Sequence, residues 1–336
     1  MRVAILGAGS IGGFVGGCWQ AAGLDISFIG RPAFARDIAR HGLVLSDYDG
    51  WSATLPAADV AYGIDPATLA DADLIVLCVK SGATGDAARQ VADHARPGTA
   101  VLSLQNGISN VDVLREILGP GFPVFRGMVP FNVAYLGNGQ FHKGVAGQLY
   151  ADDVPAMRQL SAAIGPSPAA VNLSQDMLGI AWGKLLINLN NAINALSGQP
   201  LLPELRNRGY RRVFAASMRE GLTLLKSAGI RPAKVGAVGP RLLPWVIAAP
   251  DLLFNSLFLK GWKIDDRARS SMADDLARGR KTEVDFINGE VVGLAERLGR
   301  DAPVNRRIVA LVNAAENGAG PLQPDALCRA ALGRQR

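Results

Sequence analysis

Short apolar runs alternate with helix-like stretches along the first half of the chain. Four runs have the length and β-branched content of buried strands: Val3–Leu6, Ile26–Ile29, Leu74–Val79 and Ala100–Leu104. Glycine, proline or aspartate separates these runs from the amphipathic segments between them. The alternation predicts a parallel, doubly wound sheet of the Rossmann type. Between residues 124 and 150 the runs become shorter and glycine-rich, which favours hairpins.

The second half follows a different pattern, in which strand-like runs are almost absent. Three long helices are expected there, over residues 174–197, 212–228 and 270–298. Ser174 is the expected N-cap of the first helix, and Ser270 or Ser271 opens the third. The chain is therefore expected to be α/β, with a Rossmann-like domain over residues 1–170 and an all-helical domain over residues 171–336.

The first apolar run leads into a turn with the spacing G-x-G-x-x-G. This turn consists of Gly7, Ala8, Gly9, Ser10, Ile11 and Gly12. The first glycine permits a tight turn, the second lets a pyrophosphate approach the backbone, and the third lets the helix pack on the strand. The N–H groups at the start of the helix attract phosphates. Because the motif lies between a strand and a helix, it predicts a dinucleotide site rather than a purely structural turn.

The end of the second run indicates which dinucleotide is bound. Enzymes that use NAD usually carry Asp or Glu there to bind the ribose 2′-hydroxyl. This chain has Gly30-Arg31 instead, and a guanidinium pairs well with a 2′-phosphate. Arg31 therefore favours NADPH/NADP+ as the cofactor, the alternative being an ordinary surface arginine.

Two more polar residues follow strands at the same edge of the predicted sheet. Lys80 comes directly after the run 74–79, where it can contact the cofactor or a substrate carboxylate, or simply be an exposed lysine. Asn106 belongs to Asn106-Gly107, a common turn dipeptide. Its position gives the amide a chance to meet the nicotinamide ribose or the substrate.

The segment 182–196 is an apolar helix that carries one lysine and four asparagines. Lys184, Asn188 and Asn191 are spaced i, i+4 and i+7, so they share one face. Several asparagines on a mostly buried helix lower its stability unless a polar ligand or an internal hydrogen-bond network satisfies them. Both interpretations stay open. A lysine partly removed from water has a lowered pKa and can donate a proton to a ketone oxygen.

The third predicted helix contributes two candidates. Ser271 at its start can offer a hydroxyl beside backbone N–H groups, which suits a carboxylate, although plain N-capping explains it as well. Glu283 is expected in the middle of this helix. There it can orient Lys184, accept a hydrogen bond from a substrate hydroxyl, or pair with a nearby cation such as Arg280.

Composition narrows the classes of function. The net charge is +6, but the cations are spread along the chain without interleaved aromatic residues, so nucleic-acid binding is not expected. Scattered basic groups suit small anions. The most apolar stretch, residues 242–258, is interrupted by two prolines and an aspartate, which makes it too short to span a bilayer. We expect a cytoplasmic protein that does not bind a membrane.

Cysteine and histidine give no sign of a metal centre. The chain has three cysteines and three histidines, and all six are isolated from one another along the sequence. This spacing predicts neither a disulfide framework nor a zinc site. We expect no metal in the mechanism, so a general acid must come from another kind of residue.

Together these motifs resemble the ketopantoate reductase (2-dehydropantoate 2-reductase) family over nearly the whole chain. The resemblance rests on the order and spacing of short segments, namely residues 7–12, Lys80, 105–107, Lys184 with Asn188, 271–289 and 302–305. It implies a Rossmann domain joined to a helical domain, with the active site in the cleft between them. It also implies NADPH-dependent reduction of ketopantoate to pantoate, in pantothenate and coenzyme A biosynthesis.

The resemblance further implies roles for single residues. Lys184 would protonate the C2 carbonyl oxygen, and Glu283 would help to bind or orient the substrate. Asn106, Asn188 and Ser271 would hold the keto acid and its hydroxyl. Arg31 matches the family's contact to the 2′-phosphate.

The chain departs from the family pattern at Ala192, where the family commonly has a second asparagine followed by proline. Asn191 and Asn194 flank this position, and either can take over the contact to the substrate. The segment 232–263 is also longer and more apolar than the family pattern. It can reshape the cleft or form a subunit contact.

Other functions remain open beside ketopantoate reduction. A paralogous reductase would act on another small 2-keto acid, and a non-catalytic regulator would bind NADPH without turnover. The presence of both Lys184 and Glu283 disfavours the regulator, since a sensor needs no proton donor. The expected partner is a small 2-keto acid rather than nucleic acid or membrane, and the expected assembly is a monomer or homodimer.

Overall fold

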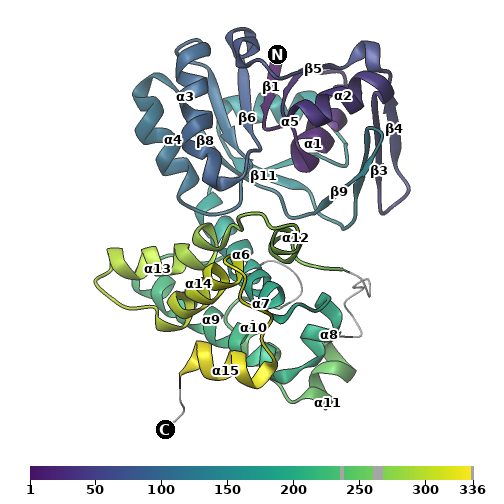
Figure 1. Cartoon of the computed structure of the whole chain (residues 1–336). Coiled ribbons are helices and arrows are strands. Elements are labelled where there is room, and N and C mark those ends of the chain that lie inside the picture. The colour runs from purple at the N-terminus through teal and green to yellow at the C-terminus, as the bar shows by residue number, and fades with distance from the viewer. Residues whose placement is uncertain (235–237, 260–267, 334–336) are drawn as a thin grey trace. The chain divides into compact units, whose positions relative to one another are not determined.

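The computed structural model describes residues 1–234, 238–259 and 268–333. It divides into two compact units, Met1–Met177 and Leu178–Arg336. The first unit is α/β and the described part of the second is helical, which confirms the fold class expected from the sequence (Figure 1). The division falls after Met177 rather than at residue 170, because strand β12 (Val171–Ser174) pairs with β11 (Leu149–Asp152) and so belongs to the sheet.

The first unit is built on an eight-stranded sheet in the order β12-β11-β8-β7-β6-β1-β2-β5. Its other strands are β1 (Arg2–Leu6), β2 (Asp25–Ile29), β5 (Ala61–Gly63), β6 (Leu74–Leu77), β7 (Ala100–Ser103) and β8 (Val124–Met128). Neighbouring strands run parallel, apart from the pair β8 and β11. The chain passes from β1 to β2 on one side and later returns to β6 on the other. The strand order therefore reverses at β1, which is where open α/β sheets bind ligands.

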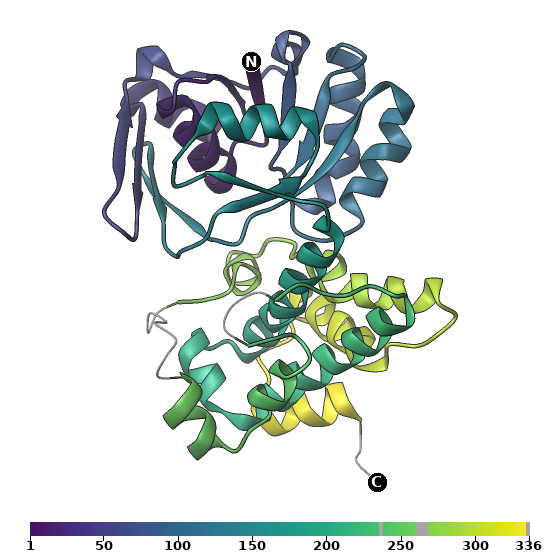
Figure 2. The same ribbon diagram turned by 180° about the vertical axis from the view of Figure 1, so that it is seen from behind.

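Both faces of this sheet are buried, as the continuous apolar runs of its strands require. In β1, Val3 and Ile5 face one hydrophobic cluster, while Ala4 and Leu6 face the other. The first cluster includes side chains of α1 (Ser10–Ala21) and α5 (Pro155–Ile164), which is seen in front of the sheet in Figure 2. The second includes side chains of α3 (Thr84–His94) and α4 (Asn110–Leu118).

A second, four-stranded sheet lies in the same unit. Its strands, in spatial order, are β4 (Ser52–Leu55), β3 (Leu43–Asp47), β10 (Gln140–Lys143) and β9 (Val133–Gly137). The hairpin between β9 and β10 turns at Asn138 and Gly139, which both have positive φ. Of the segment 124–150, only this part is a simple hairpin, because β8 and β11 join the main sheet instead.

Two of the three helices expected in the second unit are interrupted. The helix expected from Ser174 to residue 197 is two helices, α6 (Met177–Asn188) and α7 (Asn190–Ser197). Ser174 is the last residue of β12, and its hydroxyl accepts from the N–H of Asp176 (3.1 Å). The middle helix, α9, covers Arg208–Ser227.

The third expected helix is also interrupted. α12 covers only Ser271–Ala277, and Gly279 has positive φ, which ends the helix. A 3-10 turn, η7 (Val284–Phe286), and α13 (Asn288–Arg297) follow. Glu283 therefore immediately precedes η7 and does not lie in mid-helix.

Helix α9 is the centre of the second unit. Further helices are α2 (Pro32–His41) in the first unit, and α8 (Leu201–Arg206), α10 (Leu243–Ile247), α11 (Asp251–Leu253), η5 (Phe254–Phe258), α14 (Pro303–Glu316) and α15 (Pro324–Leu332) in the second. Helices α7, α8, α10, α13, α14 and α15 all contact α9. A buried polar network joins three of these helices. Asn305 of α14 accepts from Ser217 and Asn288 and donates to Glu220 (2.7 Å).

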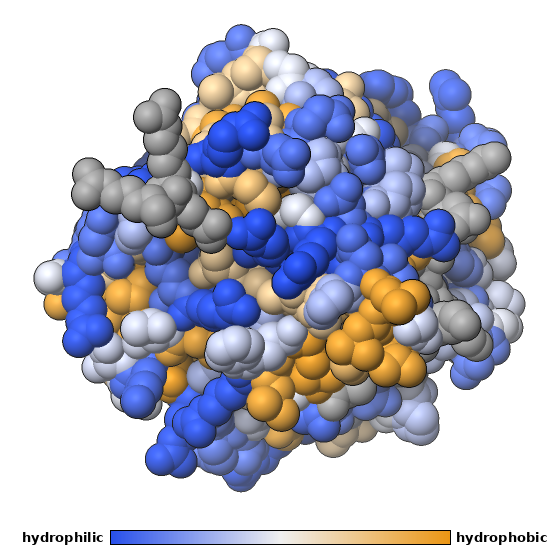
Figure 3. Space-filling model, turned by 90° about the horizontal axis from the view of Figure 1, so that it is seen from below, coloured by the Kyte–Doolittle hydropathy of each residue, from blue (hydrophilic) through white to orange (hydrophobic). Residues whose placement is uncertain are grey.

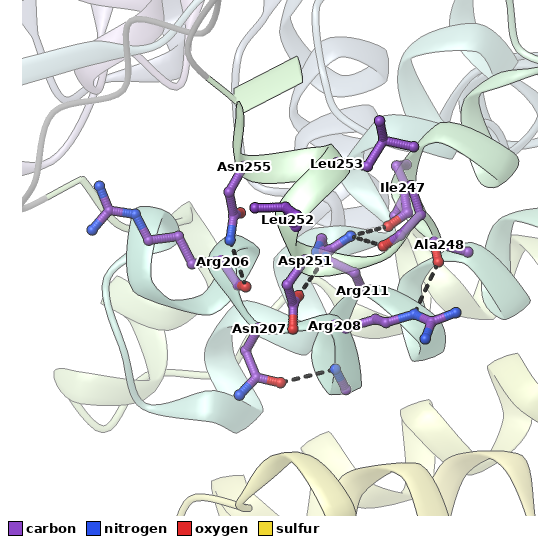
Figure 4. Close-up of polar contacts among 12 residues, drawn as sticks. Arg206, Asn207, Arg208, Arg211, Ile247, Ala248, Asp251, Leu252, Leu253 and Asn255 are labelled. Atoms are coloured by element: carbon purple, nitrogen blue, oxygen red, sulfur yellow. Dashed lines mark hydrogen bonds and ion pairs between the residues drawn. The ribbon is translucent and has the colours of Figure 1, made fainter. Parts of the chain in front are cut away.

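The fully buried Arg211 of α9 binds the segment 247–251 to α9 through hydrogen bonds and an ion pair. Its guanidinium donates to the carbonyl oxygens of Ile247 (2.7 Å) and Ala249 (2.8 Å) and pairs with Asp251 (Figure 4). The same guanidinium lies 4.1 Å from the ring centroid of Phe254. These contacts hold the short helices α10 and α11 against α9.

Apolar side chains are exposed beyond this anchor, and apolar surface is visible in Figure 3. Trp245 is 69% exposed and Leu252 is 84% exposed. Both belong to the apolar segment 232–263 noted in the sequence, of which residues 235–237 and 260–263 lie outside the described residues. No helix in the described ranges is long and apolar enough to cross a membrane.

Replacing Asn305 by leucine should lower the free energy of unfolding by about 3 kcal/mol, because it leaves the buried side chains of Ser217 and Asn288 without this partner and removes one hydrogen bond to the half-buried Glu220. Urea unfolding measures this change. Asn317→Ala, on the exposed end of the same helix, is the control and should change stability by less than about 0.5 kcal/mol. Equal stability of Asn305→Leu and the wild type would contradict the role assigned to the network.

Candidate functional site

Three strand ends lie level at one edge of the main sheet. Leu6 of β1 is in register with Leu77 of β6, and Leu77 is in register with Ser103 of β7. The residues that follow these strands therefore emerge side by side, next to the point where the strand order reverses. The glycine turn, Lys80 and Asn106 all begin at this edge, as the sequence predicted.

The three glycines of the turn have different surroundings. Gly7 has positive φ, and a Cβ there would lie 2.5 Å from Val79. A Cβ on Gly12 would lie 2.9 Å from Ile5 and 3.1 Å from Cys78, so this glycine allows close packing of α1 on the sheet. A Cβ on Gly9 would meet only the carbonyl oxygen of Gly7, at 3.9 Å. The backbone at Gly9 is therefore open to an approaching ligand.

Helix α1, which follows the turn, has N–H groups at its start that no side chain caps. No side chain caps α1 at Gly9, and its first turn holds no acidic residue. The turn itself is fixed, since the N–H groups of Gly7 and Ala8 both donate to Ile29 O (2.9 Å each) and the Tyr62 hydroxyl donates to Ala8 O. A fixed turn before a helix N-terminus without a capping side chain can bind an anion, because the positive end of the helix dipole lies there.

Arg31 lies at the end of β2, directly before α2, and is exposed. Its guanidinium carbon is 5.2 Å from the ring centroid of Phe34. Burial raises the pKa of Tyr62, and the charge of Arg31 acts against that rise. Because Tyr62 also holds the glycine turn, Arg31 places a positive charge near the turn.

Lys80 and Asn106 are positioned by a buried polar network that the sequence pattern did not reveal. Lys80 is exposed and precedes the short 3-10 turn η3 (Ser81–Ala83). The Ser81 hydroxyl donates to the carbonyl oxygen of Asn106 (2.9 Å), and Asn110 donates to both. One sequence feature could have indicated this network, namely the polar residue Gln105 directly after the apolar run 100–104. The amide of Gln105 donates to the hydroxyl of Thr84 (2.8 Å), which belongs to the network.

Lys184 lies on α6 with its side chain partly buried. Removal from water lowers the pKa of its ammonium to about 8, and the carboxylate of Glu283 acts in the opposite direction. Lys184 and Glu283 therefore interact electrostatically in the structure. They are 99 residues apart in the sequence, so no helical or strand spacing could have predicted this interaction. An amine of this kind titrates close to neutral pH, where a proton donor is most effective.

Two asparagines accompany Lys184. Asn188 ends α6 and Asn191 lies in the first turn of α7, and both are partly exposed. The break between the two helices at Leu189 is mild, because its φ and ψ stay in the right-handed helical region. Among the described residues, neither side-chain amide has a hydrogen-bond partner, so both can bind a polar ligand.

Asn194 has a structural role instead of the substrate contact considered in the sequence. It is fully buried, donates to Gln199 O (3.0 Å) and accepts from the N–H of Ser270 (2.9 Å). Ser270, rather than Ser271, caps α12 through Ala273 N (3.1 Å). Ser271 is exposed and does not cap the helix. Of the two asparagines that flank Ala192, only Asn191 has a side chain that stays available for a ligand.

A metal centre has no support in the described parts of the chain. No group of three or more His, Cys, Asp or Glu side chains there could hold a metal ion. The three cysteines are free thiols. The helical unit offers one amine, one carboxylate and several amides. The first unit, taken by itself, offers a glycine turn that can bind an anion.

Glu283→Gln should lower the pKa of Lys184 further below about 8, since the carboxylate is the group that raises it against desolvation. NMR titration of the lysine amine measures this pKa directly. Asp285→Asn is the matched control, because Asp285 is exposed and its charge acts on Lys281. An unchanged or higher pKa of Lys184 in Glu283→Gln would show that the two groups do not interact.

Comparison with known proteins extends over both units. Residues 3–156 match the family model "Ketopantoate reductase PanE/ApbA", and residues 176–316 match its C-terminal counterpart. A 2-dehydropantoate 2-reductase of Pyrococcus abyssi is 30% identical over 325 residues, which cover 94% of this chain and 98% of that protein.

Solved structures agree with this assignment. The crystal structure of a PanE/ApbA family ketopantoate reductase from Ralstonia eutropha superposes with a TM-score of 0.79 at 30% identity, covering 94% of this chain and 99% of that one. D-mandelate dehydrogenase, solved with NADH and anilino(oxo)acetate, shares the fold with a TM-score of 0.76 at 21% identity, covering 94% and 99%. The chain is an oxidoreductase and belongs to the ketopantoate reductase PanE/ApbA family.

Proposed function

We propose that the protein reduces 2-dehydropantoate to pantoate with NADPH, a step of pantothenate and coenzyme A biosynthesis. The observation that carries the proposal is a lysine on α6 that interacts with the carboxylate of Glu283 and shares its helix face with two partly exposed amides, Asn188 and Asn191. Burial lowers the pKa of Lys184 to about 8. Relatives named 2-dehydropantoate 2-reductase, which align over 94–95% of this chain, support the choice of substrate.

A nicotinamide dinucleotide fits the first unit on three grounds. The backbone at Gly9 is open, the N-terminus of α1 has no capping side chain, and no carboxylate ends β2. Arg31 would pair with a 2′-phosphate, which favours NADPH over NADH. Gly7 to Gly12 would hold the pyrophosphate, with Lys80 and Asn106 nearer the reacting end. When bound, the cofactor supplies a hydride to the substrate carbon.

The helical unit would supply the other groups that the reaction needs. Lys184 would donate its proton to the C2 oxygen as negative charge develops there. Glu283 would keep the amine protonated and orient it. Asn188, Asn191 and the exposed Ser271 would hydrogen-bond the carboxylate and hydroxyl of the keto acid. In this proposal the N-terminal unit binds the cofactor and the C-terminal unit binds the substrate and protonates it.

A second substrate has a specific observation in its favour. Ala192 stands where the family pattern commonly has a second asparagine, and it is fully buried. One amide contact to the far end of the substrate is therefore missing or is replaced by Asn191. A different small 2-keto acid would fit this change, and the chemistry at C2 would be the same.

Steady-state assays with a panel of small 2-keto acids, each with NADPH and with NADH, test the proposal. We expect the highest kcat/KM for 2-dehydropantoate with NADPH. A higher value for another keto acid would select the second substrate. Binding of NADPH without turnover of any member of the panel would refute an enzymatic role.

Arg31→Ala should raise the KM for NADPH roughly 30-fold, equivalent to about 2 kcal/mol, because a charge-assisted pair with the 2′-phosphate is lost. The KM for NADH should hardly change, since NADH has no such phosphate. Arg36→Ala, at an exposed position of α2 five residues after Arg31, is the control. Equal effects of Arg31→Ala on both cofactors would contradict the selection by this residue.

Lys184→Ala should lower kcat by roughly a hundredfold or more, because general-acid catalysis is lost. The affinity for NADPH should stay nearly unchanged. In the wild type, kcat for reduction should fall as pH rises through about 8, since only the ammonium form carries the proton. A variant that keeps its activity, or a kcat that rises through this range, would exclude Lys184 as the acid.

A further inference from the structure

A carboxyl group without a role in the proposed chemistry is buried in the helical unit. Glu204 of α8 is fully buried, and one of its oxygens, Oε2, accepts from the side-chain amides of Asn190 (3.1 Å) and Asn194 (3.5 Å) of α7. Unlike Lys184 and Glu283, this group was not singled out by the sequence pattern. A buried carboxyl that contacts two asparagines needs a physical reason to be there.

Two oxygens in this cluster have no hydrogen-bond partner among the described residues. They are Oε1 of Glu204 and Oδ1 of Asn190, and they belong to the same interacting pair. Two acceptors cannot bond each other, but a proton on Oε1 that is donated to Oδ1 pairs both atoms. The result is an acid–amide pair with one hydrogen bond in each direction.

Burial also favours the neutral acid form of Glu204. Burial raises its pKa to about 8, against the amide hydrogen bonds and the charge of Arg211. Arg211 of α9 is already paired with Asp251 of α11 (Figure 4), so its charge is balanced without a second carboxylate. The phenol of Tyr210 donates to Leu322 O (2.9 Å). Burial raises the pKa of Tyr210, and Glu204 raises it further when its carboxyl group is ionised.

The cluster continues to residues of the proposed substrate site. Asn194, held by Glu204, accepts from the N–H of Ser270 (2.9 Å). The hydroxyl of Ser270 in turn donates to the carbonyl oxygen of Asn191 (3.1 Å). One carboxyl group thereby fixes the start of α12, which carries Ser271, relative to the turn of α7 that carries Asn191.

We propose that Glu204, as a neutral carboxylic acid paired with Asn190, is a positioning residue that holds Asn191 and Ser271 in place for the keto acid. The proposal rests on the proposed function for its substrate, but not for the state of the carboxyl group. Glu204 touches neither substrate nor cofactor and acts through Asn194 and Ser270.

Three variants separate positioning from stability. Glu204→Leu removes the pair and should raise the KM for 2-dehydropantoate about tenfold, because buried amides lose their partner and the site relaxes. The KM for NADPH should stay the same. Glu204→Gln can accept from and donate to Asn190 as the acid does, so it should restore most of the keto-acid affinity. Glu220→Leu, in the α9–α14 network, should lower the melting temperature without changing this KM.

Asn194→Ala covers the case in which Glu204→Leu does not fold. It removes the acceptor for the Ser270 N–H and should raise the same KM by a similar factor. The positioning role is overturned if the folded variants at these two positions lose melting temperature, as Glu220→Leu does, while the keto-acid KM is unchanged. The neutral state is overturned if Glu204→Gln is as impaired as Glu204→Leu.

The pH dependence gives a second readout. As pH rises through about 8, ionisation of Glu204 should raise the keto-acid KM of the wild type but not of Glu204→Gln. Lys184 titrates in both proteins, so the difference between the two profiles isolates Glu204. Identical profiles would contradict the proposal.

Infrared spectroscopy tests the protonation state without any substrate. The difference spectrum between the wild type and Glu204→Gln at pH 7 should contain the carbonyl stretch of a protonated carboxylic acid, and a carboxylate band in its place would overturn the proposal. If the wild type does not reduce 2-dehydropantoate, the proposed function fails. The infrared band and faster amide exchange at Ser270 in Asn194→Ala would still decide the role of Glu204.

Discussion

The partial burial of the Lys184 ammonium is the constraint on which the helical unit depends. A pKa lowered from 10.5 to about 8 corresponds to an unfavourable energy on the order of 3 kcal/mol for the charged form. The folded state binds fewer protons than the unfolded state between these values. The unfavourable energy is therefore present in full below pH 8 and is relieved as pH rises through this window. This net energy already includes the favourable charge of Glu283. Other interactions must therefore hold the unit together.

Some of those interactions come from the asparagines of residues 188–194, of which two face the protein interior and two stay partly exposed. Asn188 and Asn191 are three residues apart and stay partly exposed beside Lys184, whereas Asn190 and Asn194 are four apart and turn inward. Two polar faces are thus interleaved on consecutive helical turns. The inward pair bonds protein groups, and the outward pair has no protein partner in the described chain. The asparagines that bond protein groups and those proposed to bind the ligand differ only in their position around the helix.

Four adjacent strands of the main sheet, β7, β6, β1 and β2, could be predicted from the sequence, because strands buried on both faces appear as unbroken apolar runs. The outer strands β5, β8, β11 and β12 were not predicted as members of this sheet. Leu74–Val79 and Ala100–Leu104 differ from β6 and β7 only at their ends. The helical unit was less predictable. Gly279 lies within a stretch whose helical periodicity continues on both sides, so nothing local distinguishes a tolerated glycine from one with positive φ. Glu283 was consequently placed in mid-helix, although its pairing with Lys184 was among the possibilities considered.

The choice between Asn191 and Asn194 could not be made from the sequence for a different reason. Spacing shows which face a side chain occupies, but its role depends on what lies opposite that face. For Asn194 the partners are Gln199, Glu204 and Ser270, the last of them 76 residues away. Similarly, Asn106 is fixed by Ser81 across 25 residues of chain. Hydrogen bonds between residues so far apart in the sequence produce no periodic pattern. The sequence can show that an asparagine in an apolar helix needs a hydrogen-bond partner. Only the structure shows whether that partner belongs to the protein or is left to a ligand.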